Sequence, residues 1–241
     1  MVSIFFTIEF FFLKIWYTRF NQLNESEDIK MDILETMKAR HSVRQYKNQA
    51  IESSKREKIN ALIKDVNAES KLSIQVFYDE PKCFDSFMAH YGKFENVKNY
   101  IAIVGNKNDQ EKAGYYGEKI VLKCQKLGLN TCWVAMTHGK SKAQIKRGQK
   151  LLIIISLGYG ETQGVPHKSK SIAELGQADQ KNEWFEKGME AVSLAPTAVN
   201  QQKFYFELKN GIVTAKNLGG FYSRIDLGIV KYHFEVVTGH E

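Results

Sequence analysis

Hydrophobic positions follow two different periods along residues 31–241. In 54–66, apolar residues recur three and four positions apart, which is the spacing of one face of a helix. In 72–78 they occupy every second position, as in a half-buried strand, and 151–157 is a Leu- and Ile-rich run typical of a central strand. These patterns predict helices over 31–39, 54–66, 114–127 and 182–194, and strands over 72–78, 100–104, 130–136, 151–157 and 203–209.

The order of these elements indicates an α+β fold, in which helices pack around a mixed central β-sheet. The chain has 241 residues, of which 43% are hydrophobic, and this is enough to bury a sizeable core. We therefore expect a single domain over residues 31–241.

Residues 1–30 differ from the rest of the chain. Residues 2–17 are strongly apolar and aromatic but include Glu9 and Lys14. The run is short and charged for a transmembrane helix, and it lacks the basic start and small-residue cleavage site of a signal peptide. We interpret 1–30 as an extension outside the fold, with a native start at Met31. A membrane anchor is the alternative, so a membrane partner is expected only if this extension is native.

Two stretches of the chain, 59–78 and 189–208, resemble each other at a constant offset of 130 positions. Ile59 then matches Met189, Ile74 matches Phe204, and both stretches are patterned as helix, polar loop and strand. We take this as the basis of a hypothesis that the chain contains an internal duplication. Chance similarity of two amphipathic helix–strand units is the alternative.

The formal net charge is +7, but basic and acidic residues are interspersed over most of the chain. The exception is 140–150, which has five Lys or Arg residues and no carboxylate. No aromatic residues interleave there to stack on bases, so nucleic acid is not an expected partner. Cys83, Cys124 and Cys132 have neither metal-ligand spacing nor a paired framework, which favours a reducing cytoplasm and no metal site.

Two short segments carry the candidate chemistry. Residues 40–44 read Arg-His-Ser-Val-Arg and place two guanidinium groups and a hydroxyl at the end of a predicted helix. Such groups suit a phosphate, which accepts charge-assisted hydrogen bonds from each of them. Near the other end, 195–204 reads Ala-Pro-Thr-Ala-Val-Asn-Gln-Gln-Lys-Phe. No nucleophile elbow, HExxH, Walker loop or complete dinucleotide fingerprint is present to compete with them.

Together the two segments resemble the R-[RH]-S-x-R and A-P-[ST]-x-x-N-x-Q elements of flavin-dependent nitroreductases, both of which contact FMN. The resemblance covers nearly all of residues 31–241. It includes 127–134, which is similar to L-G-L-G-T-C-W-[IV] with Asn130 in place of Gly, and the Gly-Tyr-Gly of 158–160 followed by a basic segment. The A-P-[ST] element comes late in this chain, as in a branch of nitroreductases with a rearranged or duplicated half.

The resemblance implies an FMN site assembled from four parts of the chain. The first Arg and the Ser of 40–44 would bind the phosphate end, and Arg44 would lie near the flavin ring, where a cation favours hydride acceptance. Backbone amides after Trp133 would face the ring, basic residues of 166–170 would close on the phosphate, and 196–200 would cover the ring. The expected cofactor-binding residues are Arg40, His41, Ser42, Arg44, Trp133, Val134, Ala135, Met136, Lys168, Lys170, Pro196, Thr197 and Asn200.

The same resemblance implies an NAD(P)H oxidoreductase. NADH or NADPH would deliver hydride to flavin N5 and leave, and a nitroaromatic or quinone-type small molecule would then take electrons from the same face. Family members build each FMN site at a dimer interface, so we expect either a monomer with an internal pseudo-two-fold axis or a homodimer. The alternatives are an FMN storage or sensor protein without turnover and a flavin-using dehalogenase-like relative.

One further segment, 84–91, is rich in large apolar side chains. We interpret Phe84, Phe87, Met88 and Tyr91 as part of the core, because aromatic residues are mostly buried in folded proteins. A lid over the substrate side of the flavin is the alternative.

Overall fold

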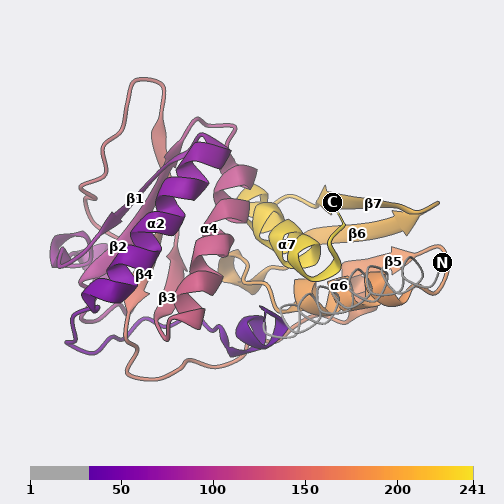
Figure 1. Cartoon of the computed structure of the whole chain (residues 1–241), viewed down its shortest axis with the longest axis horizontal. Helices are drawn as coiled ribbons and strands as arrows, with labels where there is room; N and C mark the ends of the chain where they lie inside the picture. Colours follow the sequence, from indigo (N-terminus) through magenta and orange to yellow (C-terminus); the bar gives the residue numbers. More distant parts are fainter. Residues whose placement is uncertain (1–32, 241) are drawn as a thin grey trace, which may run out of the picture.

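The computed structural model describes residues 33–240, and it confirms the predicted α+β fold. The residues are arranged around two separate β-sheets rather than one mixed sheet (Figure 1). The first sheet has the order β1-β2-β4-β3 and the second the order β5-β6-β7. The strands are β1 (Ser73–Phe77), β2 (Asn99–Gly105), β3 (Asn130–Val134), β4 (Lys150–Gly158), β5 (Gly176–Ala178), β6 (Phe204–Lys209) and β7 (Ile212–Asn217).

All neighbouring strands of the first sheet are antiparallel. The second sheet is mixed, because β5 and β6 are parallel whereas β6 and β7 form an antiparallel pair. The predicted strand 203–209 therefore exists, but it pairs with β5 and β7 and does not join the sheet that contains β4.

The helices of the described residues include all four predicted ones, with ends that differ by a few residues, and three that the sequence patterns did not predict. They are α2 (Ser53–Ser70), α3 (Phe87–Tyr91), α4 (Gln110–Lys126), α5 (Ile172–Leu175), α6 (Glu183–Ser193) and α7 (Ser223–Thr238), and residues 33–39 are also helical. The sequence patterns do not predict α7, because it is buried around most of its circumference and shows no clear polar face. The predicted extension over 1–30 lies outside the described residues.

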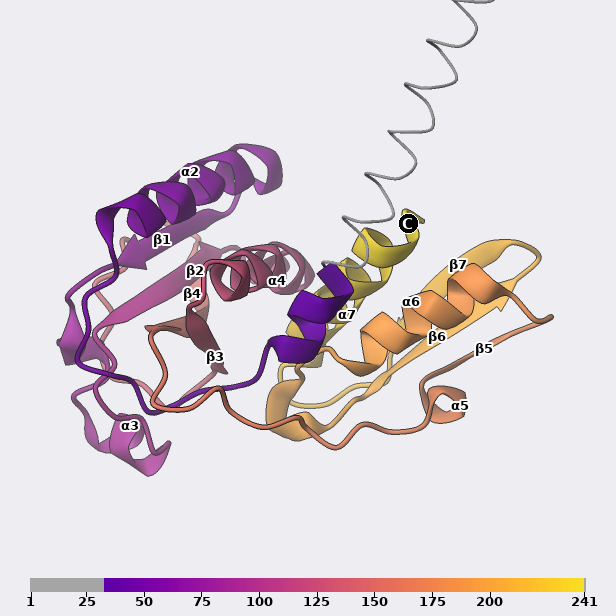
Figure 2. The same cartoon turned by 60° about the horizontal axis from the view of Figure 1, so that its bottom comes forward.

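The two sheets are covered differently. Helices α2 and α4 lie on one face of the first sheet, and the segment that includes α3 contributes to an apolar cluster on its other face (Figure 2). Strand β2 is accordingly buried along its whole length. Helices α6 and α7 lie against the second sheet, whereas most residues of β7 are exposed.

The order of elements repeats within the chain. Apart from the short α3 between β1 and β2, the first unit is α2-β1-β2-α4 and the second unit is α6-β6-β7-α7, each with an antiparallel strand pair between two helices. Helix α2 begins at Ser53 and α6 at Glu183, so the offset of 130 positions seen in the sequence also relates the two helices. This topology supports the hypothesis of an internal duplication.

The two units meet through α4 and α7, which lie side by side in both views (Figures 1 and 2). Glycines allow this close approach. A Cβ atom added at Gly114 of α4 would overlap the carbonyl oxygen of Ile225, and one added at Gly228 of α7 would overlap that of Glu111. Backbone therefore packs directly on backbone at the crossing.

We predict that Gly228→Ala destabilises the protein. At a solvent-exposed helix position, Gly→Ala would stabilise the protein by about 1 kcal/mol, because Ala has the higher helix propensity. A lower stability of the variant would therefore report on the close packing at the crossing. We expect the free energy of unfolding to fall by about 1–3 kcal/mol because the added methyl group forces the helices apart. Urea denaturation measures it, with the exposed Lys187→Ala of α6 as the control. An unchanged or higher stability would contradict the packing described here.

Candidate functional site

A cavity of about 500 Å³ lies where the two units meet. Its wall on the side of the first sheet comes from 42–44, the end of α3, and the residues of β3 and the loop that follows it. Its wall on the other side comes from 196–199 and the start of α7. The lining residues are Ser42, Arg44, Tyr91, Gly92, Lys93, Cys132, Trp133, Ala135, Met136, Thr137, Ile153, Pro196, Thr197, Ala198, Val199, Phe221, Tyr222, Ile225, Asp226 and Ile229.

The segment 42–44 reaches the cavity because it runs alongside β3. Ser42 forms a parallel bridge with Thr131, and the Val43 amide donates to the Thr131 carbonyl at 3.0 Å. Side chains alternate in such extended backbone, so Val43 is buried while Ser42 and Arg44 are exposed and line the cavity. The local conformation therefore presents a hydroxyl and a guanidinium on the same side.

The loop 195–202 forms the opposite wall and has an unusual backbone. Val199, Asn200 and Gln202 all have left-handed φ angles, of 48°, 55° and 46°. This region is uncommon for residues other than Gly and is a real outlier for a β-branched residue such as Val199. Hydrogen bonds to Thr197 stabilise the loop. The backbone N–H of Gln202 donates to Thr197 Oγ1 at 3.1 Å, and the backbone N–H of Asn200 donates to the Thr197 carbonyl at 3.0 Å.

Asp226 of α7 stabilises the loop 195–202 through two hydrogen bonds. One carboxylate oxygen accepts from the Ala198 amide at 2.9 Å, and the other accepts from Gln201 Nε2 at 2.7 Å. Burial raises the pKa of Asp226 to about 6, and the hydrogen bonds from Gln201 and Ala198 oppose that rise. The cavity wall thus contains a carboxyl group that titrates near neutral pH.

A buried charged cluster lies behind the cavity and crosses from α4 to α7. Glu118 Oε1 of α4 is 3.1 Å from His233 Nε2 of α7, and Glu118 Oε2 accepts from the indole nitrogen of Trp133 at 3.0 Å. The other ring nitrogen of His233, Nδ1, is 2.8 Å from the Ala191 carbonyl, so the imidazole is held from both sides. Because Trp133 lines the cavity, the hydrogen bond from Trp133 to Glu118 helps to hold part of the cavity wall in place.

Two opposing effects set the pKa of Glu118. Burial, the largest effect, raises it, but the His233 and Arg40 charges and the Trp133 hydrogen bond together hold the pKa below its usual range. Glu118 is therefore an ionised carboxylate that balances the positive charges around it.

Arg40 belongs to this cluster and does not line the cavity. Its Nε is 3.9 Å from Glu118 Oε1, and its Nε and Nη1 are buried without a hydrogen-bond partner. Burial lowers the pKa of the guanidinium, although Glu118 opposes this effect. Unpaired buried donors of this kind are costly, because nothing replaces the water they have lost.

The structure brings part of the predicted cofactor site together. Seven of the thirteen expected residues line the cavity, which are Ser42, Arg44, Trp133, Ala135, Met136, Pro196 and Thr197. The other six lie outside its lining, which are Arg40, His41, Val134, Lys168, Lys170 and Asn200. Val134 is buried in the apolar cluster on the outer face of the first sheet, since its side chain points away from that of Trp133.

Three of these six residues, Lys168, Lys170 and Asn200, take part in hydrogen bonds between the basic segment and the loop 195–202. Asn200 Nδ2 donates to the Lys168 carbonyl at 2.9 Å, and Lys170 Nζ donates to the Gln202 carbonyl at 3.1 Å. The basic segment is thereby tied to the loop 195–202, and its Gly164 lies against His41.

Sequence reasoning missed several lining residues, among them Lys93, Phe221 and Asp226. It was also wrong about part of 84–91. Phe84 is in the core, but Phe87, Met88 and Tyr91 are exposed, and Tyr91 lines the cavity. Phe87 and Tyr91 are four positions apart, which is a helical signal for a shared face, but the pattern does not say whether that face is buried.

Comparison with known proteins gives the family. Residues 32–238 match the family model described as "Putative TM nitroreductase". The match covers most of the chain, which therefore belongs to this nitroreductase family. No curated protein sequence matches the chain.

Solved structures share the fold. A putative nitroreductase from Thermotoga maritima is 23% identical with a TM-score of 0.61, over 85% of this chain and 82% of that one. An FMN-dependent nitroreductase from Clostridium difficile is 22% identical with a TM-score of 0.43, over 58% of this chain and 92% of that one. A putative nitroreductase from Desulfovibrio desulfuricans, in complex with FMN, is 15% identical with a TM-score of 0.47, over 59% and 93% of the two chains.

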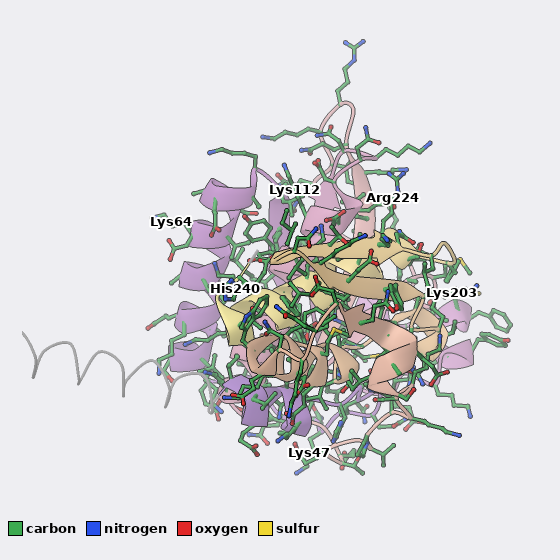
Figure 3. All side chains as sticks on the ribbon, turned by 90° about the vertical axis from the view of Figure 1, so that its right-hand side faces the viewer. Lys47, Lys64, Lys112, Lys203, Arg224 and His240 are labelled. Carbon is green, nitrogen blue, oxygen red and sulfur yellow. The ribbon has the colours of Figure 1, made fainter. Side chains whose placement is uncertain are left out.

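The surface agrees with the dispersed charge seen in the sequence. The labelled cations Lys47, Lys64, Lys112, Lys203 and Arg224 lie on different sides of the molecule and form no single patch (Figure 3). Within residues 33–240, none of the helices combines the length and hydrophobicity needed to cross a bilayer.

We predict that Glu118→Gln lowers the free energy of unfolding by about 3–5 kcal/mol, because it leaves the charges of His233 and Arg40 buried without their counterion. Urea denaturation at neutral pH measures this loss. Glu111→Gln is the matched control: its pair with Lys231, at 2.6 Å, joins the same two helices but is partly exposed. The control should cost about 0–1 kcal/mol. Equal effects of the two variants would contradict the role of Glu118.

We predict a pH dependence for Asp226. Its folded pKa of about 6 exceeds the unfolded value of 3.8, so the stability it contributes is complete below about pH 4 and is lost as the pH rises through 6. Asp226→Asn cannot ionise. Between about pH 4 and pH 7, the wild type should therefore lose about 1–3 kcal/mol of unfolding free energy relative to the variant. A difference that stays constant over this range would show that Asp226 titrates normally.

Proposed function

We propose that the protein is an FMN-dependent NAD(P)H oxidoreductase that reduces small-molecule acceptors of the nitroaromatic or quinone type. One observation carries the proposal: a single cavity joins Ser42 and Arg44, the residues after Trp133, and Pro196 and Thr197. These are parts of the segments that resemble the FMN-contacting elements of nitroreductases, and they are far apart in the sequence. A volume of about 500 Å³ is in the range of cofactor sites.

A buried positive charge close in sequence to Ser42 supports an anionic group at this part of the cavity. Arg40 is two residues away and has buried N–H groups without acceptors. A phosphate oxygen is a suitable acceptor for guanidinium N–H groups. We propose that His41 and Ser42 bind the FMN phosphate, that Lys168 and Lys170 contribute from the neighbouring basic segment, and that Arg40 adds its positive charge from behind the cavity wall.

The remaining lining residues suit the flavin ring. Arg44 and Lys93 supply positive charge on one wall, and Pro196, Thr197 and Ala198 supply small side chains on the other. Small side chains permit close approach of a flat ring, and a fixed cation stabilises negative charge that develops on it. We propose that Trp133, Val134, Ala135 and Met136 contact the edge of the flavin ring, partly through their backbone amides. The loop 195–202, which includes Asn200, would cover the face of the ring.

The duplicated fold supports one site in each chain. At the offset of 130 positions, the loop 195–200 of the second unit corresponds to 65–70 of the first unit, and those residues are still part of α2. The first unit therefore has no loop that could cover a second flavin. We propose a monomer in which the pseudo-two-fold pair of units completes a single cavity.

When bound, FMN supplies a centre that accepts hydride from NADH or NADPH and passes electrons to the acceptor. The chain's own contribution is to hold, orient and tune this group. Asp226 keeps the covering loop in place, Glu118 orients Trp133, and Arg44 places a positive charge beside the ring.

The absorption spectrum of the purified protein, followed by anaerobic addition of NADH and then NADPH, tests the proposal. We expect one flavin per chain, bleaching by at least one nicotinamide, and recovery with a nitroaromatic or quinone. A protein that cannot be loaded with FMN would refute the function. A flavin that neither nicotinamide reduces would favour storage or sensing.

We predict that Arg44→Ala weakens flavin binding and slows its reduction. Loss of a charge-assisted contact should cost about 1–3 kcal/mol, which fluorescence titration of FMN measures directly. Lys47→Ala is the control, because Lys47 is an exposed cation three residues away that does not line the cavity (Figure 3). Equal affinities of the two variants would remove Arg44 from the site.

A further inference from the structure

Several residues that line the cavity have large apolar side chains that are open to solvent. Tyr91, Met136, Val199 and Phe221 line the cavity and are 75%, 57%, 85% and 45% exposed. Phe87, one helical turn from Tyr91 on the same face of α3, is 82% exposed. We call these five residues the apolar rim. Scattered apolar residues are normal on a surface, but a cluster around one opening marks a binding site.

The rim draws on both walls of the cavity. Phe87, Tyr91 and Met136 come from the side of the first sheet, whereas Val199 and Phe221 come from the covering loop and the start of α7. The duplicated architecture thus places apolar groups on opposite sides of a single opening. A ligand that leaves the cavity would pass between them.

The conformation of Val199 in this rim is energetically unfavourable. Its backbone has a φ of 48°, which is unfavourable for a β-branched residue, and its apolar side chain gains little from burial. Such strain persists only where surrounding contacts enforce it, and here Asp226 fixes the preceding Ala198 amide. The loop therefore holds an apolar side chain at the mouth of the cavity despite both penalties.

We propose that the apolar rim binds a hydrophobic substituent of the electron acceptor, so that the preferred acceptors carry a reducible ring with an alkyl or prenyl chain. This inference rests on the proposed function, which places the flavin in the cavity and leaves the acceptor at its mouth. The cationic residues Arg44 and Lys93 line the cavity and can donate hydrogen bonds to the oxygen atoms of the ring. The chain of the acceptor then lies across the rim and removes its side chains from water.

A pair of 1,4-benzoquinones that share one ring tests the proposal, one with a methyl group and the other with a ten-carbon alkyl chain. Isothermal calorimetry on the FMN-loaded protein gives the dissociation constant of each quinone. We expect the alkyl quinone to bind at least about tenfold more tightly, because a few buried CH₂ groups suffice for this difference. Equal affinities would overturn the proposal.

Variants show whether the rim causes the preference. Phe87→Ser and Tyr91→Ser together should reduce the affinity ratio of the two quinones several-fold. Ile212→Ser is the matched control, since Ile212 is an exposed apolar residue of β7, which lies far from α3 in Figure 2. A ratio that stays the same in the double variant, or falls equally in the control, would also overturn the proposal.

The test separates the two proposals from each other. Failure to load FMN, or failure of NADH and NADPH to reduce it, counts against the proposed function. The quinone pair is then measured on the protein as purified, and an alkyl preference that depends on Phe87 and Tyr91 would still support the rim as a binding surface. Equal affinities there would overturn the rim proposal as well.

Discussion

The close approach of α4 and α7 is the constraint on which the rest of the structure depends. Gly114 and Gly228 let the two backbones touch, and this contact sets the position of the second unit relative to the first. The cavity has one wall from each unit, so its width follows from the crossing of these two helices. A bulkier residue at Gly114 would displace Ile225 of α7, which lines the cavity, and would shift the two walls relative to each other.

The same crossing accounts for the buried charges. Glu118 lies on α4 and His233 on α7, and their pairing across the interface requires the helices to be close and in one register. Burying ions is costly, and they are tolerated because each carboxylate oxygen has a partner. Trp133 is one of these partners, so the charges that join the units also orient a side chain of the cavity wall. The interface between the two units and the wall of the cavity are therefore connected through Glu118 and Trp133.

One loop makes the two units different. Helix α2 continues to Ser70, whereas α6 stops at Ser193 and is followed by a strained loop that covers the cavity. Asp226 stabilises this loop with hydrogen bonds to Ala198 and Gln201. In the described residues this loop therefore occurs only in the second unit.

The sequence alone predicts most of the helices and strands between residues 33 and 240, suggests an internal repeat, and identifies several segments that line the cavity. Periodicity reports which face of an element is apolar, and motif spacing reports local backbone chemistry, and both are properties of neighbouring residues. Such local patterns do not predict that β6 belongs to a second sheet or that Phe87 and Tyr91 are exposed. They also do not predict that Arg40 is buried beside Glu118. Only the tertiary structure decided these features, because strand pairing, burial and ion pairing depend on residues that are distant in the sequence and are brought together by packing.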